Sequence, residues 1–274
     1  MGTKQRTLVI VFGGADYNRI KSYNCTSLYQ AEFGSTNVSD FQPREPSIII
    51  ASLITGELPR VHGIDREYII ENNVIRRIYE FMRSRSETTR QTAGSLVDVK
   101  KRRPIKSDFH IDTIFDQIDG SIPVSIPSYN PEAAWCVDRN VISPLEYPEL
   151  GLDAAEHLLE KNFEWRKKRC LEAIDSDSPF VMCHFQKIDS VQHLYYKYSD
   201  DEDRIKQVYH EMDELAADIK DRAQECGFDR IDFISEHGLP RDDSLKHEDT
   251  GFYSSNQSLG LDTPSITEFH ETYI

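Results

Sequence analysis

Phe233-Ile-Ser-Glu-His-Gly-Leu-Pro240, followed in the next loop by His247, is the stretch from which the fold of this chain is best inferred. Asp232-Phe233-Ile234 is apolar enough for a buried strand, and the glycine and proline that follow end it. Glu236 and His237 therefore project from the carboxyl end of a strand, where open α/β sheets bind ligands. A carboxylate beside two imidazoles suits a divalent cation such as zinc or manganese. The alternative is a solvated turn that contains two histidines.

Two further apolar segments predict buried strands that end in polar residues. The segment from Thr7 to Phe12 ends at two glycines, with Asp16 close behind. Asp16 is interpreted first as the cap of the next helix and second as a metal ligand. Pro179-Phe-Val-Met-Cys-His-Phe185 is followed by Asp189 and His193. Positions i and i+4 share one face of a helix, so these two side chains could bind one cation together, although Asp189 could also be a helix cap.

A third apolar segment places a hydroxyl near the same edge of the sheet. The polar loop from Ser35 to Pro46 leads into Ser47-Ile-Ile-Ile-Ala-Ser-Leu-Ile-Thr-Gly56, which predicts a buried helix with its N-terminus towards the site. Free N–H groups there would hold the oxygens of a phosphoryl or sulfuryl group while Ser47 attacks it. The alternative is that the Ser47 hydroxyl caps the helix.

Helical segments alternate with these strands along the chain. Amphipathic helices are predicted at Leu152–Ile174, Asp203–Cys226 and Asn72–Arg85, and the charged run Arg166-Lys-Lys-Arg169 is expected to be solvated. This alternation indicates an α/β fold with a mostly parallel central sheet and helices on both faces. At 274 residues the chain is long enough for one such domain, residues 1–274, with a small cap.

Residues 84–108 interrupt the pattern, and we expect a small cap or loop insertion there. Periodicity fails, and Lys100-Lys-Arg-Arg-Pro104 forms a basic cluster in an acidic protein. The cluster is interpreted as a solvated loop or, alternatively, as a cap segment that meets an anionic substrate.

Composition excludes some partners and indicates others. A formal net charge of -15 argues against duplex nucleic acid, which requires a basic face. The acidic surface fits either a halophilic source or an ordinary acidic cytosolic protein. Five scattered cysteines without C-x-x-C spacing predict reduced thiols. No signal segment or apolar run of membrane-spanning length is present, so we expect a cytoplasmic protein without a membrane span.

The motifs taken together resemble the alkaline phosphatase superfamily. They occur in the order of that family and extend over nearly the whole chain, and the branch of type I phosphodiesterases and nucleotide pyrophosphatases is the most similar. Sulfatases and cofactor-independent phosphoglycerate mutases are relatives. The motifs are Ala51-Ser-Leu-Ile-Thr-Gly56, Pro59-Arg-Val-His-Gly-Ile64, Asp189-x-x-x-His193, Ser235-Glu-His-Gly238 and His247.

The resemblance implies two metal sites beside a serine or threonine nucleophile. The ligands of the first site carry over as Asp189, His193 and His247. The second site would use an aspartate from the loop after the first strand, the nucleophile and an Asp-His pair. In this sequence that pair is Glu236-His237.

Two more positions of the second site depart from the family pattern. Gly13 stands where the family has its aspartate, and Asp16 comes three residues later as a substitute candidate. Pro46 stands at the position of the nucleophile, and Ser47 is adjacent. Losing hard ligands weakens a cation site, so these departures bear directly on activity.

The resemblance implies a metal-dependent hydrolase of phosphate mono- or diesters, or of sulfate esters, that uses Ser47 and one or two divalent ions. Zinc or manganese is expected first, and magnesium or calcium second. The substrate would be a small anionic ester, and nothing indicates an oligomeric state. The rival interpretation is a catalytically silent relative that keeps one metal site for binding or regulation. A phosphoglycerate mutase fits poorly, because the segment from Glu67 to Ser178 has room only for a small cap.

Overall fold

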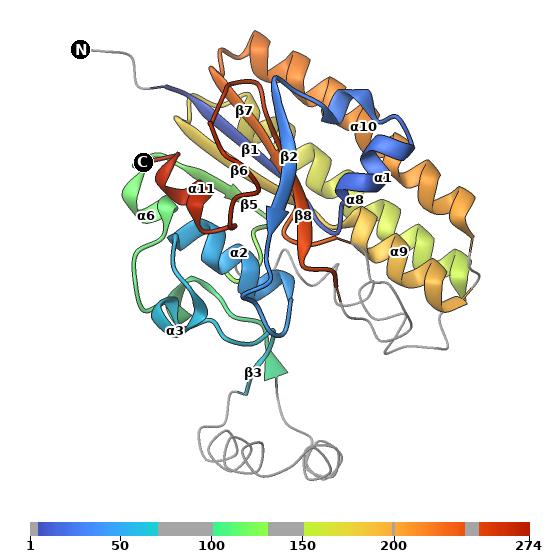
Figure 1. Cartoon of the computed structure of the whole chain (residues 1–274), viewed down its shortest axis with the longest axis horizontal. Helices are drawn as coiled ribbons and strands as arrows, with labels where there is room; N and C mark the ends of the chain where they lie inside the picture. Colours follow the sequence, from blue (N-terminus) through green and yellow to red (C-terminus); the bar gives the residue numbers. More distant parts are fainter. Residues whose placement is uncertain (1–4, 71–100, 131–150, 199–200, 239–246) are drawn as a thin grey trace.

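The computed structural model describes residues 5–70, 101–130, 151–198, 201–238 and 247–274, and its centre is a six-stranded sheet (Figure 1). The strands lie in the order β2-β8-β7-β1-β6-β5. Within this sheet β8 alone runs opposite to its neighbours, and the other pairings are parallel. The predicted α/β fold with a mostly parallel sheet is therefore confirmed. The strands are β1 (Thr7–Phe12), β2 (Glu32–Asn37), β5 (Ile122–Val124), β6 (Phe180–Phe185), β7 (Arg230–Ile234) and β8 (Thr250–Ser255).

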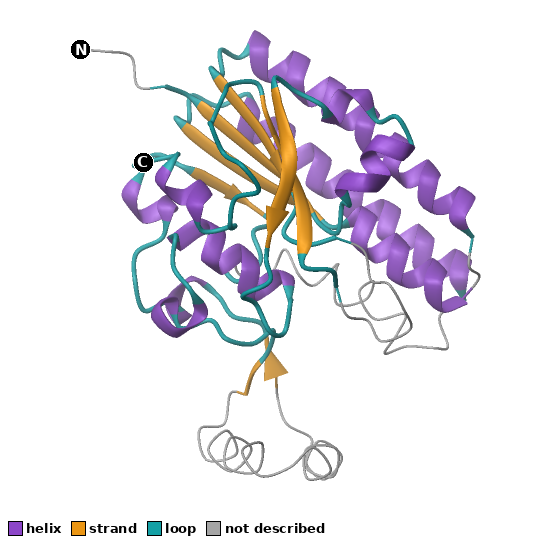
Figure 2. Cartoon of the chain, viewed as in Figure 1, coloured by secondary structure: helices purple, strands orange, loops and turns teal. Residues whose placement is uncertain are grey.

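Helices cover both faces of this sheet (Figure 2). The observed helix α8 coincides with the predicted one, and α10 is shifted from its prediction by one residue at each end. The long helices are α2 (Pro46–Thr55), α8 (Leu152–Ile174), α9 (Lys187–Tyr198) and α10 (Glu202–Glu225). The short ones are α1 (Tyr17–Ser22), α3 (Pro59–His62), α6 (Ile114–Gln117), α11 (Glu268–Glu271) and the 3-10 turns η1 (Thr26–Leu28) and η2 (Lys106–Asp108).

The central strand β1 serves two hydrophobic cores because successive side chains of a strand point to opposite faces. Leu8, Ile10 and Phe12 pack in one core with side chains of α8, α9 and α10. Val9 and Val11 pack in the other core with side chains of α2, α6 and α11. Every residue of β1 is buried, so the strand fixes the position of the loop that follows it.

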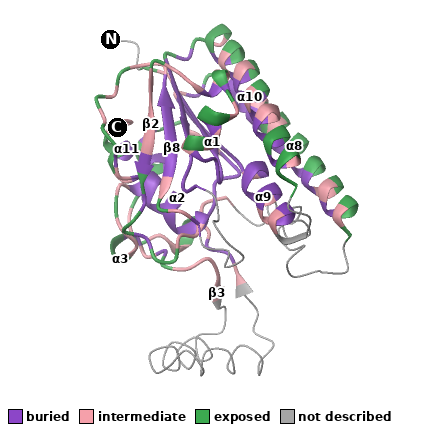
Figure 3. Ribbon diagram, turned by 45° about the vertical axis from the view of Figure 1, so that its right-hand side comes forward, coloured by how far each residue is buried: buried purple, intermediate pink, exposed green. Residues whose placement is uncertain are grey.

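Helix α2 is buried along its whole length (Figure 3). Its residues are apolar or small on every side, which is the composition that a fully buried helix requires. Glu45 is the N-cap residue, Pro46 occupies the first turn, and Gly56 ends the helix in the left-handed conformation at φ 71°. The helix therefore begins one residue before the predicted Ser47.

The strand pair β2 and β8 is not indicated by the sequence pattern. The predicted polar loop from Ser35 to Pro46 is wrong for its first three residues, which complete β2. β2 pairs antiparallel with β8 at the edge of the sheet and is mostly half-buried. A half-exposed edge strand carries few apolar residues, which explains its weak sequence signal.

A two-stranded sheet lies at the base of the predicted insertion. β3 (Ile69–Ile70) pairs antiparallel with β4 (Lys101–Arg102). The predicted helix at Asn72–Arg85 and the predicted cap from residue 84 to residue 100 lie outside the described residues. The assignment of residues 1–274 to a single domain stays a prediction.

The described part of the basic cluster is ion-paired. Arg102 Nη2 donates to Asp108 Oδ1 at 2.8 Å, and Arg103 Nη2 lies 3.0 Å from Glu67 Oε1. Arg103 is buried, so the expectation of a solvated loop is wrong at this position. The two arginines neutralise carboxylates of the same region.

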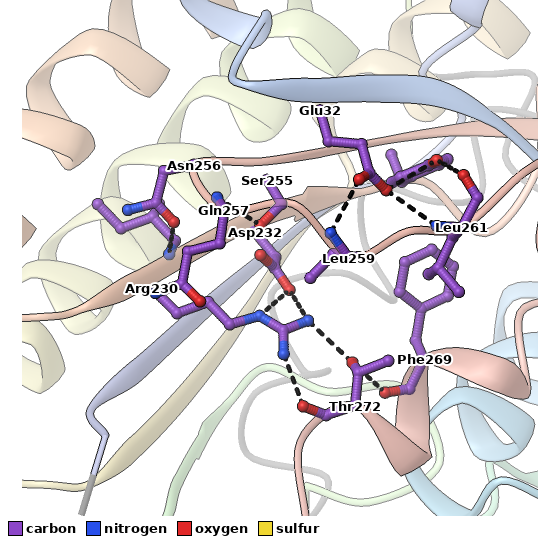
Figure 4. A network of polar contacts seen from close by, with 12 residues as sticks. Glu32, Arg230, Asp232, Ser255, Asn256, Gln257, Leu259, Leu261, Phe269 and Thr272 are labelled. Atoms are coloured by element: carbon purple, nitrogen blue, oxygen red, sulfur yellow. Dashed lines mark hydrogen bonds and ion pairs between the residues drawn. The ribbon is translucent and has the colours of Figure 1, made fainter.

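A network of hydrogen bonds holds residues 259–272 against the sheet (Figure 4). The buried guanidinium of Arg230, at the start of β7, donates to Asp232 Oδ2 at 2.6 Å and to Thr272 O at 2.6 Å. Glu32 of β2 accepts hydrogen bonds from the backbone N–H groups of Leu259 and Leu261. These contacts hold the C-terminal segment over the end of the sheet where β7 begins.

Two further expectations concern the described part of the chain. None of its helices is long and apolar enough to cross a membrane. Cys25, Cys170, Cys183 and Cys226 are free thiols, and the first three are buried.

Candidate metal centre

The candidate site lies at the carboxyl ends of three adjacent strands. β7, β1 and β6 are neighbours in the sheet and run parallel, so their carboxyl ends lie at one edge (Figure 1). Gly13-Gly14 follows β1, Asp189 follows β6, and Glu236-His237 follows β7. Residues from three distant parts of the sequence are brought together in this way, at the edge where α/β sheets bind ligands.

The predicted ligands of the first metal site converge on one point. Asp189 Oδ1 lies 3.3 Å from His193 Nε2 and 3.5 Å from His247 Nε2, and the two Nε2 atoms are 3.0 Å apart. Four ligands held tetrahedrally at metal bonds of about 2.0–2.1 Å stand about 3.3–3.4 Å from one another. The triangle therefore has the size of one face of a coordination tetrahedron. That these residues bind a metal stays a prediction.

The orientation of His247 suits a ligand role. Its Nδ1 donates a hydrogen bond to the backbone oxygen of Arg44 at 2.7 Å, since a carbonyl can only accept. In the neutral ring, the lone pair is then on Nε2, the atom that faces Asp189. A backbone carbonyl behind the ring is a common means of fixing the orientation and tautomer of a metal-binding histidine.

Asp189 and the histidines of the triangle shift one another's pKa values. Burial acts to raise the pKa of Asp189, but the charges and hydrogen bonds of His193 and His247 lower it well below its usual value. Burial acts to lower the pKa of His247, but the hydrogen bond and charge of Asp189 raise it to about 9. A divalent cation would take the place of the proton, because histidine must be neutral to coordinate a metal.

Glu236 and His237 lie directly beside this triangle. The His237 ring stacks on that of His247, with centroids 3.6 Å apart and planes inclined by 17°. Donor atoms of Asp189, His237 and His247 lie within 4.8 Å of one another. His237 Nδ1 donates to Gly238 O at 3.0 Å, which leaves its Nε2 without a hydrogen-bond partner among the described residues. Burial lowers the pKa of His237 to about 4, so the ring is neutral at pH 7.

His184 is a site residue that the sequence reasoning missed. It is the penultimate residue of β6 and is buried, with Nε2 3.5 Å from Glu236 Oε1. Burial acts to raise the pKa of Glu236, but His184 and His237 lower it. Alternation along β6 places His184 on the face of Phe180 and Met182, which are core residues. A histidine at an apolar position near the carboxyl end of a strand was the available signal.

Comparison with known proteins bears on the fold. No family model and no curated protein matches the chain in sequence. Among solved structures, a mutant of the alkaline phosphatase PafA matches with a TM-score of 0.58 and 13% identity, over 87% of this chain and 64% of that chain. The chain has the alkaline phosphatase-like fold. The resemblance noted in the motifs is thus confirmed at the level of the fold.

Two other structures with the alkaline phosphatase-like fold match less closely. Murine ectonucleotide pyrophosphatase/phosphodiesterase 5 in complex with AMP has a TM-score of 0.48 and 12% identity, over 85% of this chain and 57% of that chain. Phosphonoacetate hydrolase from Sinorhizobium meliloti has a TM-score of 0.49 and 13% identity, over 86% and 56%. This chain thus spans less than two thirds of the length of each of the three structures.

Ser47 lies in the first turn of α2 in this alkaline phosphatase-like fold. The helix-cap interpretation is wrong, because Glu45 is the N-cap residue. The Ser47 side chain is fully buried, and within the described part of the chain its Oγ has no hydrogen-bond partner. The helix start is tied to the triangle, since Arg44 O accepts the hydrogen bond from His247.

Asp16 has the first of the two roles considered for it. It is the N-cap of α1, where its Oδ1 accepts a hydrogen bond from Arg19 N at 2.8 Å. Its own N–H donates to Tyr209 Oη at 2.9 Å. Burial raises the pKa of Asp16 despite the hydrogen bond from Arg19. Its carboxylate is thus engaged in holding the helix that follows β1.

Arg166 of α8 is buried, although the sequence predicts that its charged run is solvated. Only 2% of its surface is exposed. Its Nε donates to Asn162 Oδ1 at 2.7 Å, and its Nη1 donates to His184 O at 2.9 Å. The long side chain reaches from α8 to the end of β6, so it supports the backbone that carries His184.

Ser52 and His62 form a buried pair that has a structural role. His62 Nδ1 accepts a hydrogen bond from Ile64 N at 3.1 Å, so Nε2 is the protonated nitrogen and donates to Ser52 Oγ at 2.9 Å. In this tautomer the ring cannot remove a proton from Ser52. Burial also lowers the pKa of His62 to about 4.

Proposed function

We propose that this chain is a metal-dependent hydrolase of phosphate mono- or diesters with Ser47 as its nucleophile. One observation carries the proposal: the donor atoms of Asp189, His193 and His247 lie 3.0–3.5 Å apart at the carboxyl edge of the sheet. A divalent cation bound there would supply Lewis-acid stabilisation and favour the ionised form of a neighbouring hydroxyl. Two imidazoles and a carboxylate favour zinc or manganese over magnesium or calcium.

The residues around Ser47 support its assignment as nucleophile. Its hydroxyl is buried at the start of a ten-residue helix and makes no hydrogen bond to any described residue. Pro46 has no N–H, and the N–H groups of Ile48 and Ile49 both donate to Glu45 O. Within the described residues the Ser47 N–H is therefore the donor of the first turn that can hold an ester oxygen. Attack by Ser47 on phosphorus would release the alcohol and form a phosphoserine, which water would then hydrolyse. Sulfate esters present the same oxygen geometry and form the second substrate class.

A catalytically silent relative is the second candidate, and a specific observation favours it. Gly13 offers no carboxylate, and the carboxylate of Asp16 caps α1. The loop after β1 then contributes no free acidic ligand to a second cation. In this alternative the chain would bind one cation at Asp189, His193 and His247 and act in binding or regulation.

The two candidates are separated by metal analysis combined with turnover. The purified protein would be stripped of metal, reloaded with Zn²⁺ or Mn²⁺ and assayed with p-nitrophenyl phosphate, bis-p-nitrophenyl phosphate and p-nitrophenyl sulfate. The proposal expects cation-dependent hydrolysis, together with a phosphate trapped on Ser47 after acid quench. Bound cation without turnover would assign the silent relative. Absence of any bound cation would overturn both candidates.

A further inference from the structure

The space above Gly13 is filled by side chains from two neighbouring strands. A Cβ atom built on Gly13 would lie 2.9 Å from Glu236 Oε1 and 3.2 Å from His184 Nε2. Contacts below 3.0 Å require that a neighbour moves. The glycine therefore makes room for the ends of Glu236 and His184, which reach across from β7 and β6 to the loop after β1.

These side chains form a buried polar group that is incompletely hydrogen-bonded. Glu236 Oε1 lies 3.5 Å from His184 Nε2 and 3.7 Å from His237 Nε2. Considering the described residues, Glu236 Oε2, His184 Nδ1 and His237 Nε2 have no hydrogen-bond partner. All three side chains are at most 1% exposed. Buried polar atoms in this state carry a desolvation cost that a bound ligand would relieve.

We propose that His184, Glu236 and His237 hold a second divalent cation, and that His184 takes the place of a ligand from the loop after β1. The inference rests on the proposed metal-dependent function. The chemistry matches that of the first triangle, with two imidazole nitrogens and one carboxylate, so the ligand class is a divalent ion of the zinc or manganese type. The carboxylate comes from the longer arm of Glu236, which reaches over Gly13.

The backbone around His184 holds it rigidly enough for such a role. His184 pairs with Val11 in the sheet register, and its carbonyl accepts the hydrogen bond from the buried Arg166. Glu236 and His237 follow β7 after one intervening residue, Ser235, on the other side of β1. The three proposed ligands therefore come from β6 and from the loop just after β7, the two strands that flank β1, with Gly13 between them.

Isothermal titration of the metal-free full chain with Zn²⁺ tests this site directly. Wild type is expected to bind two ions, and His184→Ala to bind one, with the second binding event weakened by about 100-fold or more. His184→Gln keeps a polar side chain of similar reach and guards against failure to fold, which circular dichroism would reveal. Co²⁺ absorption provides a second readout, since loss of an imidazole ligand changes the visible spectrum of that ion alone.

The outcomes of the titration separate the proposed function from the inference of a second site. No binding to wild type would overturn the proposed function together with this inference. One ion in wild type, unchanged in His184→Ala but lost in Asp189→Asn, would overturn only the second site. Two ions in both wild type and His184→Ala would remove His184 from the ligand set. Two ions falling to one supports the inference irrespective of any turnover.

An exchange of residues between Gly13 and Glu236 tests the steric part of the argument. Gly13→Asp alone should displace the Glu236 carboxylate, and Glu236→Asp alone should fall short of the cation, so each variant should lose second-site affinity. The double variant places carboxylates where the family resemblance has them and should recover at least ten-fold of the lost affinity. If the double variant instead loses the sum of the two single losses in binding free energy, the two positions do not share one space.

Discussion

The two ends of helix α2 hold buried serine and histidine side chains in opposite states. Towards its C-terminus, Ser52 and His62 form a 2.9 Å hydrogen bond, and both ring nitrogens of His62 are engaged. At its N-terminus, Ser47 Oγ is equally buried but has no hydrogen-bond partner in the described ranges. The same is true of Glu236 Oε2 and His237 Nε2, beside the histidine that contacts Arg44.

This difference distinguishes residues that build the fold from residues that are available for chemistry. Leaving a buried polar group unpaired costs roughly 1–3 kcal/mol, so a protein keeps few such groups without a use for them. The Ser52 and His62 pair rigidifies the turn after α2 and has no capacity left for a ligand. The Ser47 end has hydroxyl, carboxylate and imidazole atoms available for one.

The largest expected effect comes from removing the two serine hydroxyls separately. Ser47→Ala should lower kcat for the chromogenic ester by about 10³-fold or more, as loss of a nucleophile does. The free energy of unfolding should be unchanged or rise by up to about 1–3 kcal/mol, because alanine removes a buried hydroxyl that has no partner among the described residues. Ser52→Ala should leave kcat unchanged but cost about 1–3 kcal/mol in urea unfolding, because the His62 N–H loses its acceptor. Equal effects of the two variants on kcat would erase the contrast between the ends of α2.

Next in size is the effect of neutralising one of two buried aspartates at the sheet edge. Asp189→Asn should weaken Zn²⁺ binding by about 100-fold or more, because a charged ligand of the triangle is lost. Asp16→Asn should leave the affinity unchanged, since asparagine caps a helix about as well as aspartate. Isothermal titration measures both. A comparable loss in Asp16→Asn would return Asp16 to the ligand set and weaken the distinction between capping and binding residues.

Removal of the metal should destabilise the protein through the N-terminal end of α2 only. At a free Zn²⁺ concentration of 100 times Kd, binding adds about 2.7 kcal/mol to the free energy of unfolding. Excess chelator should abolish this gain in wild type and in Ser52→Ala alike, as followed by thermal unfolding. Asp189→Asn should keep only the part of this gain that the proposed second site supplies. A chelator effect of full size in this variant would place the stabilising ion outside the triangle.

The smallest expected effect is a loss of stability in acid that comes from His62, at the C-terminal end of α2. The pKa of His62 is about 4 in the folded protein, lowered by burial from its usual 6.5, so below pH 6.5 the unfolded state binds more protons. Stability from this group is therefore present at pH 7 and is lost as the pH falls from 6.5 towards 4. In metal-free protein, wild type should lose about 1–2 kcal/mol more than His62→Asn between pH 7 and pH 5. Urea unfolding at both pH values measures this, and parallel losses would show that His62 is already protonated.

Much of the fold was predictable because its signals are local. The strand at Thr7–Phe12 and the helix at Leu152–Ile174 follow from apolar runs and periodicity over consecutive residues. The spacing of Asp189 and His193 within one helical turn determines that they share a face. Hydrophobic periodicity and ligand spacing need no information from elsewhere in the chain.

Pairing between distant segments decided the rest. The order β7-β1-β6 brings His247, Asp189 and Glu236 to one edge, and no single segment encodes that order. Neither the occupation of the space above Gly13 by Glu236 and His184 nor the burial of Arg166 can be inferred from local pattern. Hydrogen bonding and close packing across strands depend on which residues meet in three dimensions, so only the tertiary structure could show which buried polar atoms remain available for a ligand.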